Sequence, residues 1–216
     1  DSGLYIVGEH FQRVNHHLLA VKGATLEGLR TVESQLPALS QCRTFIRENG
    51  LRQATAGDTA GAAKDVAERG DPTVAAIASS LAAEIYGLET LASGIEDAEH
   101  NTTRFIVMAR EPVTPPLDGN TVVTSFVFRV RSVPAALYKA LGGFATNSVN
   151  ITKLERYLVD GHFTAAQFYA DIEGHPDDRL VNLALEELAF YSKELKILGT
   201  YPAQPYRLES PPPEDA

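Results

Sequence analysis

A proline-rich break near the middle of the chain constrains its fold more than any other feature. Residues 110–120, REPVTPPLDGN, contain three prolines and show no apolar periodicity. Because proline cannot continue a helix or pair within a central strand, we expect a linker here. The break separates residues 1–109 from residues 121–203. The proline-rich, acidic tail, residues 204–216, is predicted to be disordered.

The part before the break alternates between short apolar runs and segments with helical periodicity. Strands are predicted at the runs LYIVGE, TVAAIA and RFIVMA. ATLEGLRTV is predicted as a short helix, which Thr25 can cap, leading into a strand. Helices are predicted over LPALSQCRTFIRENG, DTAGAAKDVAERG and SSLAAEIYGLETL, with ends marked by Pro37, Gly50, Asp58 or Thr59, Gly70 and Ser79. This alternation predicts an α/β layer with a largely parallel sheet.

The part after the break has a different order of elements. Strands are predicted at TVVTSFVFRV, VNITKLERYLV, HFTAAQFYADIEG and KILGTYP, with a hairpin turn at Asp160–Gly161. Helices are predicted over SVPAALYKALGGF, with Pro134 in its first turn and Gly142–Gly143 at its end, and over PDDRLVNLALEELAFYSKEL. The resulting order βαββαβ is that of a ferredoxin-like α+β unit.

Composition narrows the classes of function. The 19 basic and 28 acidic residues give a net charge of −9, which argues against non-specific nucleic-acid binding. A site for an anion must therefore be built locally, from a few arginines or helix N-termini. No apolar run is long enough to cross a bilayer, and no signal peptide is visible. With Cys42 as the single cysteine, we expect a cytoplasmic protein without membrane partners.

The chain begins without methionine and inside a predicted strand, so we expect it to be the C-terminal portion of something longer. Metal binding is not expected, because His16 and His17 are adjacent and no ligand spacing accompanies them. Cys42 lies on the apolar face of its predicted helix, which favours a buried, inert thiol.

Hydroxyl side chains recur where helices begin after strands. Thr59 and Ser79 occupy such positions, and Thr103–Arg104 stands at the start of another strand. Helix starts in an α/β layer gather at one edge of the sheet, where ligands usually bind. For each hydroxyl the alternative is ordinary helix capping, and for Arg104 a surface position. Together they favour an anionic ligand, with Arg104 clasping a carboxylate.

The stretch AAIASSLAAEIYGLETLASGIEDAEHNTTRFIVMAR closely resembles the end of the catalytic domain of prephenate dehydratases. The resemblance is carried by Ala82, Ala83, Glu84, Tyr86, Gly87, Leu88, Asp97, Asn101, Thr103, Arg104 and Phe105. GEHFQRVNHHLLAVKG and VESQLPALSQC look like earlier blocks of that family, with His16 and Gln41–Cys42 at matching positions. Gln35-Leu36-Pro37 departs from the family's usual His-Pro-Gln.

Residues 121–203 are similar to the ACT regulatory domain that these enzymes carry. The resemblance implies a phenylalanine site that includes Ala135, Leu137, Asn147–Ser148, Asn150 and Glu155. Arg156 and Tyr157 depart from the family's Glu-Ser-Arg-Pro, and Ala135 replaces a usual glycine.

The resemblance implies a two-lobed catalytic domain of the periplasmic-binding-protein type, whose N-terminal part is expected to precede Asp1. It further implies the conversion of prephenate to phenylpyruvate without a cofactor. Thr103 would be the essential catalytic residue, and Asn101 belongs to the same motif. The loss of one such hydroxyl donor costs about 3 kcal/mol of transition-state stabilisation. As a hypothesis, Arg104 and the helix starts at Thr59 and Ser79 hold carboxylates, while Phe105 packs to fix the loop.

Regulation would follow from phenylalanine binding between the ACT domains of two subunits, which implies a homodimer or tetramer. Whether arogenate is also a substrate stays open. One alternative is a non-catalytic protein that senses amino acids or binds small molecules on the same two domains. Another is a regulatory fragment that dimerises through residues 121–203.

Overall fold

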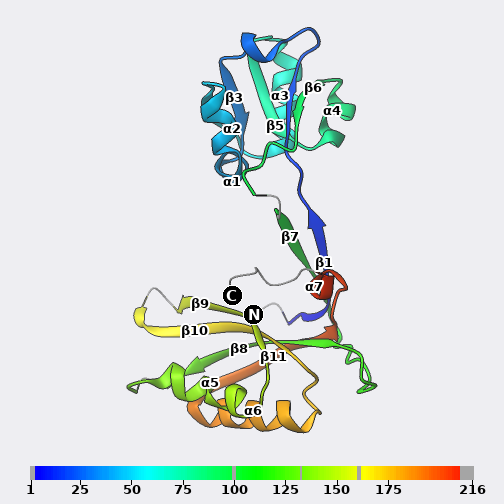
Figure 1. Ribbon diagram of the computed structural model, residues 1–216. Helices are drawn as coiled ribbons and strands as arrows, with labels where there is room; N and C mark the ends of the chain where they lie inside the picture. The colour runs from blue at the N-terminus through cyan, green and yellow to red at the C-terminus, as the bar shows by residue number, and fades with distance from the viewer. Residues whose placement is uncertain (1–2, 99–100, 132, 160–161, 210–216) are drawn as a thin grey trace. The chain divides into compact units, whose positions relative to one another are not determined.

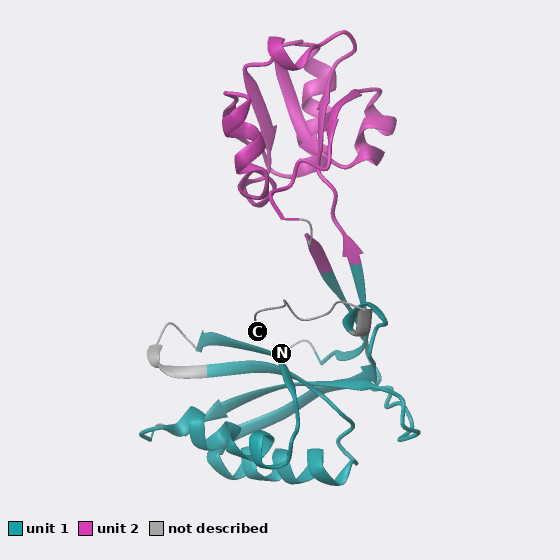
Figure 2. Cartoon of the chain, in the orientation of Figure 1, with its two compact units in different colours: residues 1–11, 104–216 teal, residues 12–103 magenta. Residues whose placement is uncertain are grey.

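Strands β1 (Tyr5–Arg13) and β7 (Thr102–Ala109) pair with each other, and the chain divides into two units within them. In this computed structural model, residues 3–98, 101–131, 133–159 and 162–209 are described. Unit 1 comprises residues 1–11 and 104–216, and unit 2 comprises residues 12–103 (Figure 2). The proline-rich segment 110–120 therefore lies within unit 1. The division differs from the predicted one because β1 contributes Ile6 to a core with Val123 and Tyr201.

Unit 2 is built on a five-stranded sheet of mixed direction. Its order is β4 (Arg52–Thr55), β3 (Thr31–Ser34), β5 (Val74–Ala78), β2 (His17–Ala20), β6 (Glu89–Ser93). Strand β3 runs parallel to β4 and β5, whereas β2 runs antiparallel to β5 and β6. The prediction of a largely parallel sheet is thus right for three strands only. Strand β6 comes from residues predicted as helix, because Gly87 is left-handed (φ 66°) and ends helix α4 (Ser80–Tyr86).

Helices cover both faces of this sheet (Figure 1). Strand β5 is buried along its whole length, and its residues alternate between two cores. Ala75 and Ile77 face helices α1 (Leu36–Gln41) and α2 (Arg43–Glu48). The other three residues of the strand face α3 (Thr59–Arg69) and α4. The short helix η1 (Leu26–Gly28) is capped by Thr25, as its sequence predicts.

Helices α1 and α2 replace the single helix predicted over residues 36–50. Cys42 joins them with a non-helical conformation (φ −122°, ψ 28°). The backbone N–H groups of Arg43 and Thr44 donate to the Asp97 carboxylate at 3.1 and 3.0 Å. Asp97 therefore acts as the cap that allows α2 to begin anew.

Unit 1 contains the predicted βαββαβ order. The elements are β8 (Val122–Val130), α5 (Ala136–Thr146), β9 (Ile151–Val159), β10 (His162–Glu173), α6 (Arg179–Tyr191) and β11 (Ser192–Pro202). The antiparallel sheet has the order β11-β8-β10-β9, and α5 and α6 cover one face (Figure 1). Phe126, Phe144 and Leu188 lie in the core between sheet and helices. The predicted turn at residues 160–161 lies outside the described residues.

The ends of α5 and of the chain differ from the prediction. Pro134 precedes α5 rather than lying in its first turn, and Gly143 lies inside the helix. A Cβ on Gly143 would lie 2.9 Å from Glu187 and 3.2 Å from the Ala184 carbonyl oxygen, so this glycine allows α6 to pack closely. The prediction of disorder is wrong for Tyr206–Glu209, which form helix α7. Residues 210–216 lie outside the described part of the chain.

Candidate functional site

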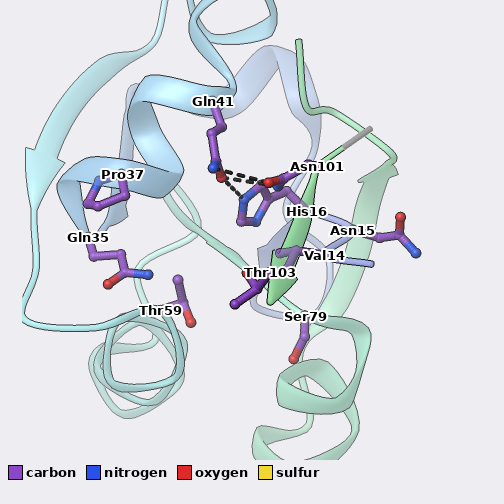
Figure 3. A pocket seen from close by; sticks show the side chains of 10 residues that line it. All are labelled: Val14, Asn15, His16, Gln35, Pro37, Gln41, Thr59, Ser79, Asn101 and Thr103. Carbon is purple, nitrogen blue, oxygen red and sulfur yellow. Dashed lines mark hydrogen bonds between the residues drawn. The ribbon is translucent and has the colours of Figure 1, made fainter. Parts of the chain in front are cut away.

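A pocket of about 240 Å³ lies in unit 2 at the edge where its parallel strands end (Figure 3). Strand β3 ends at Ser34 and leads directly to Gln35, and β5 ends at Ala78 and leads directly to Ser79. Such carboxyl ends form the usual ligand crevice of an α/β sheet. The lining residues are Val14, Asn15, His16, Gln35, Pro37, Gln41, Thr59, Ser79, Asn101 and Thr103. The structure therefore brings together four of the predicted site residues: Thr59, Ser79, Asn101 and Thr103.

Two helices begin at the pocket. Ser79 caps α4, and its hydroxyl accepts a hydrogen bond from the Ala82 N–H at 3.4 Å. In α3 the cap is Asp58, which accepts from the Gly61 N–H at 2.7 Å, so Thr59 is the first helical residue. The N–H groups of a first helical turn carry partial positive charge. Both helix starts therefore favour an anion in the pocket.

Three pocket side chains form a hydrogen-bonded set. The amides of Gln41 and Asn101 pair reciprocally, each Nδ2 or Nε2 donating to the other's oxygen at 3.1 Å. Gln41 Oε1 also lies 2.7 Å from His16 Nε2. This contact joins the His16 ring to the amide pair, so the three side chains form one network. His16 is 4% exposed, so its ring is held in one orientation at the pocket wall.

Backbone contacts hold this set in place. The His16 N–H donates to Glu96 Oε2 at 3.0 Å, and the Val14 N–H donates to the Asn101 carbonyl oxygen at 2.8 Å. These contacts fix the chain immediately before β7. Thr103 follows two residues after Asn101, and its side chain enters the pocket (Figure 3).

Arg104 lies elsewhere. It is not among the residues that line the pocket, and its guanidinium donates to Glu9, Asp171 and Tyr201 in unit 1. Neighbouring residues of a strand point to opposite faces, which explains why Arg104 does not accompany Thr103. This placement does not support the predicted carboxylate clasp. Phe105 is 54% exposed on β7, so its predicted packing against the loop is not found either.

Cys42 is fully buried, as its position on the apolar helix face predicts. The pKa of its thiol is raised to about 12, mainly by burial and to a smaller extent by the charges of Glu96 and Asp97. The thiol is therefore protonated and inert at neutral pH.

The candidate phenylalanine-site residues do not meet within one chain. Ala135 and Leu137 lie at the start of α5, whereas Ser148 and Asn150 follow its end. The 11 residues of α5 separate these two groups by about 16 Å. Glu155 is paired with Tyr169, which lies on the sheet face away from the helices.

His16, Gln35 and Gln41 line the pocket although no site role was predicted for them from the sequence. Gln35 follows β3 as Ser79 follows β5, so the rule for strand ends would have found it. His16 is brought to the same edge because His17 pairs with Ala78. That antiparallel pairing is not visible in local sequence.

Within residues 3–98, 101–131, 133–159 and 162–209, no group of three or more His, Cys, Asp or Glu side chains is placed to hold a metal ion. Across the same ranges, the helices are all too short or too polar to span a membrane.

The family model for prephenate dehydratase matches residues 1–113. A bifunctional N-acyl-homoserine lactone acylase/prephenate dehydratase of Komagataeibacter europaeus is 50% identical over 207 residues, which are 96% of this chain and 74% of that protein. An arogenate dehydratase/prephenate dehydratase of Arabidopsis thaliana is 39% identical over 208 residues, covering 92% of this chain. The chain spans 54% of the length of that plant relative.

Solved structures give the same picture. A prephenate dehydratase from Arthrobacter aurescens, in complex with L-Phe, matches 93% of this chain and 66% of its own with a TM-score of 0.82 and 29% identity. A structure described as a quorum quenching acylase matches 95% of this chain and 74% of its own, also with a TM-score of 0.82, at 50% identity.

Proposed function

Since the chain belongs to the prephenate dehydratase family, we propose that it converts prephenate to phenylpyruvate. The observation that carries the proposal is the place of Thr103. The fold brings this hydroxyl into one pocket with the hydrogen-bonded set of His16, Gln41 and Asn101.

The chemistry needs little more than position. The bond to the ring carboxylate breaks to release carbon dioxide, its electron pair enters the ring, and the ring hydroxyl departs with a proton as water. A donor that hydrogen-bonds the leaving oxygen more strongly as it gains charge lowers the barrier. We assign this role to the Thr103 hydroxyl. The described lining residues include no lysine or arginine, so the helix starts at Thr59 and Ser79 supply the positive potential for the carboxylates.

The test is the turnover of prephenate by Thr103→Ala. Removing one positioned donor is expected to lower kcat about 100-fold or more. Thr102→Ala is the matched control, because Thr102 carries the same side chain one residue earlier and does not line the pocket. Full activity in Thr103→Ala would refute the assignment. Arogenate should be assayed in parallel, since plant relatives carry that name.

A second activity is favoured by one observation, the 50% identity to a protein named as an acylase as well as a dehydratase. We propose that the chain also hydrolyses the amide of N-acyl-homoserine lactones. Release of homoserine lactone by the same preparation tests this directly. A preparation that turns over prephenate but does not hydrolyse the amide would refute the proposed acylase activity.

L-Phenylalanine is the proposed effector, and the βαββαβ unit of unit 1 is the proposed ACT domain that binds it. A related dehydratase crystallised with L-Phe supports this assignment. Because the candidate residues lie at both ends of α5, we propose a site completed by a second subunit in a homodimer or tetramer. Calorimetric titration with L-Phe, combined with light scattering, tests both parts. A monomer that binds L-Phe would contradict the shared site, and binding without any turnover would favour the alternative of a sensor.

A further inference from the structure

Gln35 occupies the N-cap position of α1, but its side chain does not cap the helix. Its backbone carbonyl oxygen accepts a hydrogen bond from the Leu39 N–H at 3.1 Å. Its side-chain amide makes no hydrogen bond with the first turn of α1. Short side chains such as serine or aspartate cap helices because they reach those N–H groups. The helix that Gln35 precedes therefore leaves the amide of Gln35 unused.

The unused amide lies in the pocket. Gln35 lines the pocket from the start of α1, and Thr59 lines it from the start of α3 (Figure 3). Both residues are half-buried, and within the described ranges neither side chain has a hydrogen-bond partner. In the same pocket, by contrast, His16, Gln41 and Asn101 bond to one another. Because polar groups at such depth are normally hydrogen-bonded, the Gln35 amide and the Thr59 hydroxyl are available to a ligand.

Helix α3 adds a favourable potential for an anion at this place. Its cap, Asp58, accepts from the Gly61 N–H at 2.7 Å, and Thr59 is its first residue. The Asp58 residue is exposed, so water screens its charge. The N–H groups of the first turn carry partial positive charge. An amide N–H, a hydroxyl and a helix start can together bind a carboxylate without lysine or arginine.

The shape of prephenate decides which of its groups can lie here. Its ring hydroxyl is on the carbon opposite the one that carries both the ring carboxylate and the pyruvyl group. If Thr103 binds the hydroxyl, both carboxylates lie across the ring from Thr103. The ring carboxylate loses its charge as carbon dioxide leaves, so donors that stabilise that charge would raise the barrier. Donors to the pyruvyl carboxylate, which keeps its charge, bind the substrate without opposing the reaction.

We propose that Gln35 is a substrate-binding residue: with Thr59 it holds the pyruvyl carboxylate of prephenate and so directs the ring hydroxyl toward Thr103. This inference rests on the proposed dehydratase function. The three residues all belong to unit 2.

Gln35→Met is the most informative variant, because methionine is close to glutamine in shape but donates no hydrogen bond. Since the Gln35 amide does not cap α1, this change is expected to leave the midpoint of thermal unfolding nearly unchanged. Gln53→Met is the matched control. Gln53 is an exposed glutamine on β4 in the same unit, and it is not among the described residues that line the pocket.

Prephenate turnover separates binding from chemistry. Gln35→Met is expected to raise KM about tenfold and to change kcat less than about threefold, because the contact is made equally in ground state and transition state. Gln53→Met is expected to leave both constants near the wild-type values. A lower kcat with an unchanged KM in Gln35→Met would overturn the assignment, since it would place Gln35 at the reacting groups.

A change of charge tests whether the bound group is a carboxylate. Gln35→Glu keeps the shape of glutamine and adds a negative charge, which repels a carboxylate. Its KM for prephenate is therefore expected to exceed that of Gln35→Met, whereas Gln53→Glu should stay near wild type. A KM in Gln35→Glu no higher than in Gln35→Met would contradict a carboxylate at this place.

A binding measurement keeps the inference separate from the proposed function. Phenylpyruvate carries the pyruvyl group but neither the ring hydroxyl nor the ring carboxylate. In calorimetric titrations, Gln35→Met is expected to bind phenylpyruvate about tenfold more weakly than wild type, and Thr103→Ala as tightly as wild type. A wild-type protein that binds phenylpyruvate without turning over prephenate would refute the dehydratase proposal alone. Equal binding by wild type and Gln35→Met, or no binding by wild type, would overturn the role of Gln35.

Discussion

The buried Cys42 thiol links stability to pH at the scale of one residue. Its pKa is raised from 9.0 to about 12, first by burial and then by Glu96 and Asp97. In the unfolded chain the thiol ionises near pH 9, whereas in the folded protein it stays protonated to higher pH. The contribution of this group to the free energy of unfolding is therefore constant below pH 9. That stability is lost progressively as the pH rises toward 12.

The prediction is a steeper alkaline loss of stability in wild type than in Cys42→Ala. The difference is expected to approach about 1.4 kcal/mol per pH unit within this window. Urea denaturation at several alkaline pH values measures it, and the comparison of slopes removes the constant cost of the cavity in the variant. Parallel slopes would contradict the burial effect.

Ala135 carries backbone strain at the start of α5. Its φ of 57° lies in the left-handed region, where a Cβ raises the conformational energy and glycine, which has no Cβ, does not. Ala135→Gly is therefore expected to stabilise the protein by about 1 kcal/mol.

The control for this change is its neighbour. Ala136 is the first residue of α5, and Ala136→Gly is expected to destabilise by up to about 1 kcal/mol, because glycine weakens a helix. Thermal unfolding of both variants checks the opposite signs. Equal destabilisation by the two substitutions would show that the left-handed conformation of Ala135 does not lower the stability of the protein.

At the scale of elements, strand β1 lies directly on β11. A Cβ on Gly199 would lie 1.9 Å from the Ile6 carbonyl oxygen, and the register of β11 shifts between Ile197 and Gly199. Gly199→Ala must therefore displace one of the two strands. The expected loss is about 3 kcal/mol in unfolding free energy, measured by urea denaturation.

Gly57→Ala is the matched substitution for this test. Nothing lies within 4 Å of a Cβ on Gly57, and its backbone is not left-handed. Its stability should stay within about 0.5 kcal/mol of wild type. A Gly199→Ala protein as stable as Gly57→Ala would mean that β1 is free to move from β11.

Element boundaries show where sequence patterns stop being sufficient. The helical periodicity of residues 36–50 is real, yet the helix breaks at Cys42. Asp97 is the cap that permits the break. Its carboxylate accepts a hydrogen bond from the N–H of Arg43, 54 residues away in the sequence. Local propensity cannot detect a partner so distant. Caps supplied by neighbouring residues, such as Asp58 and Ser79, were found because they are local.

The site residues that follow from local sequence patterns could be predicted, whereas contacts between distant residues could not. Thr59 and Ser79 follow from the rule for helix starts after strands, and Asn101 and Thr103 from a motif. The direction of Arg104 was not assigned, although strand alternation alone separates it from Thr103. Its partners Asp171 and Tyr201 are 67 and 97 residues away, so no local pattern could name them.

For the whole molecule, the cores predict how the chain unfolds. The apolar clusters of unit 2 and those of unit 1 share no described residue. We therefore expect calorimetry to show a van't Hoff enthalpy below the calorimetric enthalpy, as for two partly independent transitions. If the proposed effector site is right, addition of L-Phe should raise the transition temperature of unit 1 and leave that of unit 2 unchanged. Equal enthalpies would indicate one cooperative unit.

The division of the molecule was the part least accessible from sequence. A linear reading places the boundary at the prolines of residues 110–120. In the structure, residues 1–11 instead belong to unit 1, because Ile6 lies in its core and Glu9 forms a salt bridge with Arg104. Only the contacts of residues 1–11 with residues 104–216 in three dimensions reveal this division.

The same contacts set an order of events during synthesis. Residues 12–103 of unit 2 are all made before residue 104, whereas Glu9 can pair with Arg207 only after another 198 residues have been added. At ribosomal speeds that interval is roughly 10–40 s. Throughout it, the first half of β1 is a strand without its final neighbours, the kind of edge that invites pairing between nascent chains. A carboxylate on such an edge opposes that pairing. The Glu9 carboxylate, which forms salt bridges in the folded protein, thus also opposes pairing of β1 between nascent chains.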